Sequence, residues 1–201
     1  MQKTVVLISC AFMVIALFVG YKISQVPSAP VHYHANFAVF EGGKQVDFSS
    51  PEFMHISPCT ENEVHSDDPN ENVHLHDGIG NVVHVHADSI SWKTLFETLK
   101  YWDRLEKTHE SSRLSDLGIS IYVDGKDTSY DVLTTTIVPQ THLLISIDSQ
   151  APSTDSARLK RELDAVGNNA KEYDEGKIGI EKCGSTGKRS LWERFTIAFG
   201  L

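Results

Sequence analysis

The chain has 201 residues, of which 40% are hydrophobic and 22% charged, and its formal net charge is −9 at pH 7. This composition is typical of a globular protein and excludes a disordered or fibrous chain. The negative charge argues against nucleic acids and anionic membrane surfaces as partners, and it is compatible with binding of a cation.

The amino-terminal segment differs in composition from the rest of the chain. A short basic start, Met1–Thr4, precedes an apolar run from Val5 to Tyr21. As a helix this run would be about 25 Å long, at the low end for crossing a bilayer. It predicts an uncleaved membrane anchor over residues 1–24, in a single-pass cell-membrane protein whose remaining chain is extracytoplasmic. A signal peptide cleaved ahead of Ala29 is the main alternative, and a lipoprotein signal at Cys10 is disfavoured because most of the apolar run follows it.

The rest of the chain is expected to form one domain between two simpler segments. Residues 25–30 read as a proline-containing linker, and residues 31–148 form the predicted His-rich domain. Within it, Tyr33–Phe48 has the pattern of a hairpin, and Ser50–Asn72 that of a long loop. Residues 149–201 are predicted to be a helical tail, because apolar residues recur there at helical spacing.

The most informative stretch is Val73–His86, which reads VHLHDGIGNVVHVH. Two His-x-His pairs flank a turn rich in Gly, Asp and Asn, which predicts a hairpin. We expect His76 opposite His84 and His74 opposite His86, because this register puts all four imidazoles on one face. The opposite face would then hold the aliphatic side chains of Val73, Leu75, Val83 and Val85.

The following elements complete the predicted sheet. Ser91–Leu105 has helical periodicity, and Ile119–Val123, Lys126–Tyr130 and Thr141–Asp148 read as strands. The order hairpin, helix, strand, strand, strand over residues 73–148 resembles the β-grasp, or ubiquitin-like, fold. The resemblance implies an α+β fold with a mixed sheet, to which the first hairpin would add at an edge. The chain also resembles uncharacterised bacterial proteins that join one membrane segment to a His-rich exported domain, a resemblance that implies no activity.

The histidines point to a metal site. Eight of the ten lie between His32 and His86, and imidazole is a frequent ligand of transition metals. A divalent cation would also relieve the repulsion that protonated imidazoles would suffer on one face. Zinc is favoured over copper, because neutral nitrogen ligands suit a redox-inactive site and methionines are few. The predicted ligands are His74, His76, His84 and His86, joined by His32, His34, His55 and Cys59, with Asp77 orienting a ligand.

The sequence also permits other interpretations of the His face, the domain and the cysteines. The His face could be merely solvated, or it could be a proton-sensing cluster. The domain could be a metal-dependent hydrolase or redox enzyme, or a cell-surface interaction module without metal, and the sequence holds no established enzyme motif. Cys59 and Cys183 could form a disulfide or remain free thiols, and the protein partner is unknown.

Overall fold

The computed structural model describes residues 2–26, 31–55, 68–108, 118–148, 156–179 and 189–201, with residues 2–11 and 106–108 described by their backbone alone. The chain divides into two compact units. Residues 1–31 and 185–201 form one unit, and residues 32–184 form the other.

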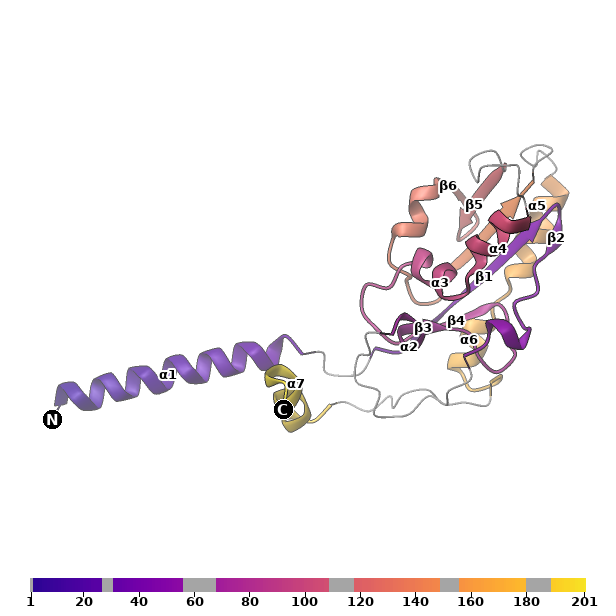
Figure 1. Cartoon of the computed structure of the whole chain (residues 1–201). Helices are drawn as coiled ribbons and strands as arrows, with labels where there is room; N and C mark the ends of the chain where they lie inside the picture. Colours follow the sequence, from indigo (N-terminus) through magenta and orange to yellow (C-terminus); the bar gives the residue numbers. More distant parts are fainter. Residues whose placement is uncertain (1, 27–30, 56–67, 109–117, 149–155, 180–188) are drawn as a thin grey trace. The chain divides into compact units, whose positions relative to one another are not determined.

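The smaller unit contains the helices α1 (Gln2–Ser24) and α7 (Leu191–Phe199) (Figure 1). Ser190 and Glu193 form a capping box that begins α7, satisfying backbone N–H groups that have no partner within the helix. The Arg194 guanidinium donates to the carbonyls of Ile23, across 2.8 Å, and Val26, across 3.1 Å. Ile23 lies in the last turn of α1 and Val26 just beyond it, so the arginine ties α7 to the end of α1.

The predicted membrane anchor is wrong. Within the described residues, the structure contains no helix with the length and apolar character required to cross a membrane. The apolar run Val5–Tyr21 has 17 residues, whereas about 20 are needed for the apolar thickness of a bilayer. Past that run, α1 ends in Lys22, Ile23 and Ser24. This finding contradicts the predicted single-pass membrane localisation. It also contradicts the membrane helix of the predicted fold class.

The larger unit is built on a mixed sheet of seven strands, in the order β3-β4-β1-β7-β5-β6 with β2 paired to β1. The central strands β1 and β7 run parallel, and the remaining pairs are antiparallel. The strands are β1 (Tyr33–Glu41), β2 (Lys44–Gln45), β3 (Val73–His74), β4 (Val82–Val85), β5 (Ile119–Val123), β6 (Lys126–Thr128) and β7 (His142–Ile147).

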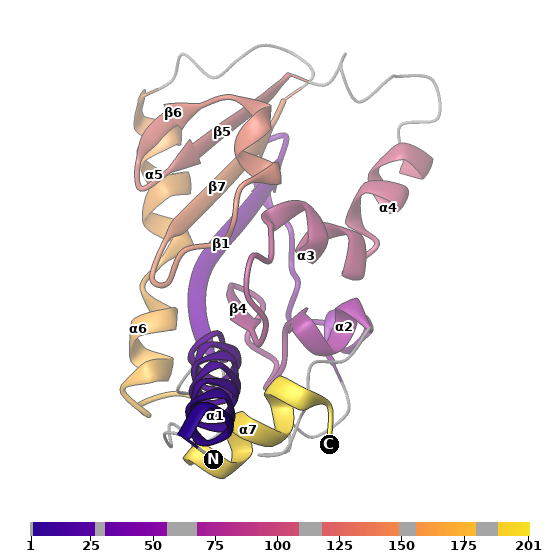
Figure 2. The same ribbon diagram turned by 90° about the vertical axis from the view of Figure 1, so that its left-hand side faces the viewer.

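Helices cover both faces of this sheet (Figures 1 and 2). On one face α3 (Trp92–Thr98) and α4 (Tyr101–Thr108) enclose the main core, and on the other lie α5 (Ser156–Val166) and α6 (Asn169–Asp174). Both α5 and α6 come from the predicted tail. The shorter helical segments are η1 (Pro51–Phe53), α2 (Pro69–Asn72) and η3 (Tyr130–Thr134).

The arrangement corrects two expectations about the sheet. The first hairpin is not an edge addition, because β1 pairs with β4 on one side and β7 on the other. The sheet therefore cannot be confined to residues 73–148, and the β-grasp resemblance over that range stays a prediction. The α+β character and the mixed sheet are as expected. The predicted helix Ser91–Leu105 divides into α3 and α4, because Lys100 adopts φ 51°, a left-handed conformation that ends a helix.

Candidate metal centre

The strand register brings the histidines into rows across the sheet. His84 on β4 lies opposite His34 of β1 on one side and opposite His74 of β3 on the other. The predicted pairing of His76 with His84 was therefore wrong by two residues. Because side chains two residues apart share a face, this shift leaves the His residues on one face. The aliphatic partners are buried in the main core on the opposite face, as expected: Val73, Leu75, Val83 and Val85.

Seven imidazoles gather on this face and are called the His cluster below. His32 stacks on His86 with 4.7 Å between ring centroids, and His55 stacks on His74 at 4.6 Å. The rings of His76 and His84 are closer still, at 3.8 Å. The members of the His cluster are His32, His34, His55, His74, His76, His84 and His86. The cluster therefore unites three strands with the segments that flank them.

Three members of the cluster have the spacing of a metal site. His32, His84 and His86 each offer one ring nitrogen, and these nitrogens lie within 4.8 Å of one another. The Nε2 atoms of all three are buried and have no hydrogen-bond partner in the described part of the chain. Buried polar atoms without partners are costly and uncommon in folded proteins. Each of the three rings therefore has one unsatisfied buried nitrogen, and the rings bring ligand atoms close to one another.

Burial holds these imidazoles in the neutral form that binds metals. Removal from solvent, followed by repulsion from His34, lowers the pKa of His32 to about 4. Removal from solvent, followed by repulsion from His32, lowers the pKa of His86 to about 3. The same causes put the pKa of His84 well below its usual value. At neutral pH the three rings are therefore uncharged, and a cation can bind to them without first displacing a proton.

Polar groups from α6 and the hairpin turn surround the cluster. His34 Nδ1 pairs with the Asp174 carboxylate, and its Nε2 lies 2.9 Å from His84 Nδ1. The Tyr173 ring packs against His84 with 4.6 Å between centroids, and its hydroxyl donates to Asp77. The Asp77 carboxylate lies 3.4 Å from His76 Nδ1. This contact is compatible with the predicted orienting role of Asp77.

Sequence reasoning identified the imidazoles and missed what covers them. The structure brings together all seven predicted His ligands, including His32, His34 and His55. The eighth predicted ligand, Cys59, lies outside the described residues, as does Cys183, so the alternatives for the cysteines stay predictions. Tyr173 and Asp174 were not anticipated, because they occur on a short amphipathic helix without a metal-binding pattern. Their only signal was the concentration of imidazoles, which require polar partners somewhere in the fold.

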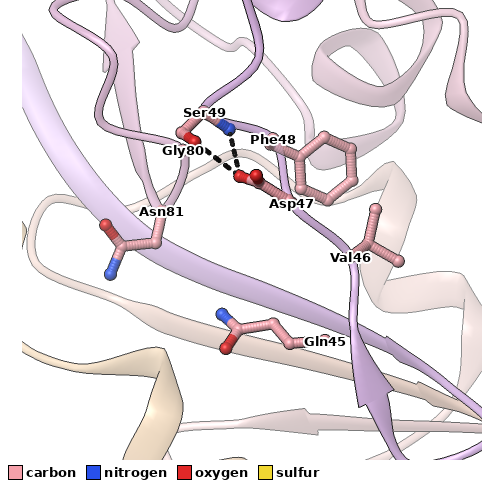
Figure 3. A pocket seen from close by; sticks show the side chains of 7 residues that line it. All are labelled: Gln45, Val46, Asp47, Phe48, Ser49, Gly80 and Asn81. Carbon is pink, nitrogen blue, oxygen red and sulfur yellow. Dashed lines mark hydrogen bonds between the residues drawn. The ribbon is translucent and has the colours of Figure 1, made fainter.

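A separate hollow of about 350 Å³ lies beside the hairpin turn (Figure 3). The Asp47 carboxylate accepts hydrogen bonds from the Ser49 amide at 2.9 Å and the Ser49 hydroxyl at 2.6 Å, so its Oδ1 is engaged locally. No imidazole lines this hollow, which is therefore distinct from the His cluster. Its lining residues are Gln45, Val46, Asp47, Phe48, Ser49, Gly80 and Asn81.

Comparison of the chain with protein-family models, curated proteins and solved structures found no significant match.

Proposed function

We propose that this protein binds one divalent transition-metal ion through His32, His84 and His86. Two observations support the proposal: each of the three rings brings one nitrogen within 4.8 Å of the others, and each has a buried Nε2 that lacks a hydrogen-bond partner among the described residues. A metal ion would accept all three lone pairs at once. In a zinc site the nitrogens would lie about 2.0–2.1 Å from the ion. The three rings would therefore move slightly closer together when the ion binds.

His74 is suited to supply a fourth ligand. Its Nδ1 lies 2.7 Å from the Asn70 carbonyl oxygen, which can only accept a hydrogen bond. The proton of the neutral ring is then on Nδ1, so Nε2 is the unprotonated nitrogen of the ring. The ring centroid of His74 is 5.0 Å from that of His86. Four nitrogen donors would complete the tetrahedral coordination that zinc adopts, which favours zinc over copper.

The burial of the cluster favours a protein that retains the metal. His84 is fully buried, and the Nε2 atoms of His32 and His86 are buried in rings that are otherwise partly exposed. An ion among these rings would be shielded from water, whereas a catalytic metal needs a coordination position that substrate can reach. We therefore favour metal binding without catalysis.

The test uses the full chain without a polyhistidine tag. The metal content of the purified protein is measured by mass spectrometry, and zinc binding to the chelator-treated protein by calorimetry. We expect one zinc per chain and loss of stoichiometric binding in His84→Ala. His142→Gln is the matched control, because His142 pairs with Asp124 and Asn168 outside the cluster. Absence of stoichiometric metal, or equal binding by His84→Ala and the wild type, would contradict the proposal.

A further inference from the structure

A linear chain of hydrogen-bonding groups leads from α6 to the proposed metal ligand His84. The Asp174 carboxylate pairs with His34 Nδ1. On the other side of the same ring, His34 Nε2 lies 2.9 Å from His84 Nδ1. The far nitrogen of His84, Nε2, is buried and has no hydrogen-bond partner among the described residues. Each ring in this chain therefore contacts the next through one nitrogen.

The chemistry of the end group fixes the direction of every bond. An ionised carboxylate only accepts hydrogen bonds, so His34 Nδ1 must carry the proton. A neutral imidazole has one N–H, so His34 Nε2 must accept, and His84 Nδ1 must donate to it. His84 Nε2 then holds a lone pair. This is the tautomer of His84 that can bind a metal at Nε2.

The opposite tautomer of His84 is disfavoured at both of its ring nitrogens. A proton on His84 Nε2 would be a buried donor with no acceptor among the described residues, and an unsatisfied buried donor is destabilising. His84 Nδ1 and His34 Nε2 would then face each other as two lone pairs across 2.9 Å. We propose that Asp174 and His34 are positioning residues that fix the metal-binding tautomer of His84, an inference that rests on the proposed metal-binding function.

The fold holds Asp174 in place for this role. Gln140 donates to the second carboxylate oxygen of Asp174. The helix that carries it is docked on β1, because the Ala170 amide donates across 2.8 Å to the buried side-chain oxygen of Asn36. Asp174 therefore reaches the His cluster from a helix attached to the sheet. In this way α6 connects the sheet to the Asp174 end of the hydrogen-bonded groups that lead to His84.

The first measurement needs no variant. Nitrogen-15 NMR of the metal-free full chain distinguishes protonated from unprotonated ring nitrogens, and we expect His84 to be protonated at Nδ1. Two substitutions at one position then separate the acceptor from the charge. Asp174→Leu removes the acceptor, and we expect mixed tautomers of His84 and a zinc Kd raised about 10–100-fold. Asp174→Asn keeps an oxygen acceptor, and we expect it to retain the tautomer and a near-normal Kd.

The outcomes separate this inference from the proposed function. A His84 protonated at Nε2 in the wild type would overturn the positioning role, whatever the variants do. Zinc binding by Asp174→Leu with wild-type Kd and tautomer would also overturn it, while leaving metal binding intact. Equal losses in Asp174→Asn and Asp174→Leu would assign the effect to charge and overturn the tautomer argument. Failure of the wild type to bind zinc would instead contradict the proposed function.

Discussion

The Tyr173 hydroxyl donates a hydrogen bond of 2.5 Å to the Asp77 carboxylate, which links α6 to the turn between β3 and β4. The Asp77 side chain is buried, with 5% of its surface exposed, and the φ of Asp77, 61°, is left-handed. A short polar residue tolerates this conformation better than most. The contact therefore joins the helix that covers the His cluster to the turn that sets the hairpin.

Loss of the hydrogen bond between Tyr173 and Asp77 should weaken the packing of α6 over the His cluster. Tyr173→Phe removes the hydroxyl and leaves a buried carboxylate with one donor fewer. We expect the free energy of unfolding to fall by about 1.5–3 kcal/mol, the range for a hydrogen bond to a charged group. Urea denaturation measures the change. Tyr130→Phe is the control, because Tyr130 is half exposed and should change stability by less than about 0.5 kcal/mol. Equal effects of the two substitutions would rule out a stabilising role for the Tyr173 bond.

Two glycines in the hairpin turn should respond differently to the same substitution. A Cβ at Gly80 would overlap the Ser49 amide nitrogen and lie 2.6 Å from the Phe48 carbonyl carbon. These are backbone atoms that cannot rotate away, so Gly80→Ala should lower the free energy of unfolding by about 3 kcal/mol. Gly78→Ala meets open space and has only the strain of a φ of +69°, about 1 kcal/mol. Thermal unfolding of both variants compares them, and a larger loss in Gly78→Ala would refute this account.

The sequence was sufficient to predict the faces of the hairpin and insufficient to predict its register. Because His alternates with Val and Leu, the position of a side chain along the strand decides its face. A register shift of two residues does not change that face. The pairing of His74 with His84 also depends on contacts outside the hairpin. Because β4 lies between β3 and β1, its position is set from both sides, and His34 on β1 has no sequence signal for its partner.

Long-range packing likewise decided what the local pattern could not. The segment Tyr33–Glu41 looked like half of an isolated hairpin, but its neighbours in the sheet are β4 and β7, distant in sequence. The helix α6 has helical spacing that predicts its existence. Its docking depends on Asn36, whose buried amide a single sequence does not distinguish from a surface one. For the same reason Asp174 could not be assigned to the His cluster.

A buried ion pair on α5 should matter more than an exposed one on the same helix. Arg158 contacts Glu162 at 2.7 Å and Asp148 at 2.6 Å, and the Glu162 side chain is only 3% exposed. Arg158→Met would leave a buried carboxylate uncompensated, and we expect a loss of about 3 kcal/mol in the free energy of unfolding. Lys160→Met breaks the exposed pair with Asp164 and should cost at most about 0.5 kcal/mol. Urea titrations measure both changes, and similar losses would show that burial is not the deciding factor.

Acid should destabilise the metal-free protein at pH values above those at which most carboxylates are protonated. In the folded chain the pKa is lowered to about 4 for His32, about 3 for His86 and about 2 for His74, whereas unfolding restores values near 6.5. Between these values the unfolded chain binds more protons, so stability falls as the pH drops below 6.5, by up to about 1.4 kcal/mol per pH unit for each imidazole. Denaturation in a chelator from pH 8 to pH 4.5 measures the slope. The double substitution His32→Gln/His86→Gln should reduce it, and His142→Gln should not. A stability independent of pH over this range would contradict the burial of neutral imidazoles.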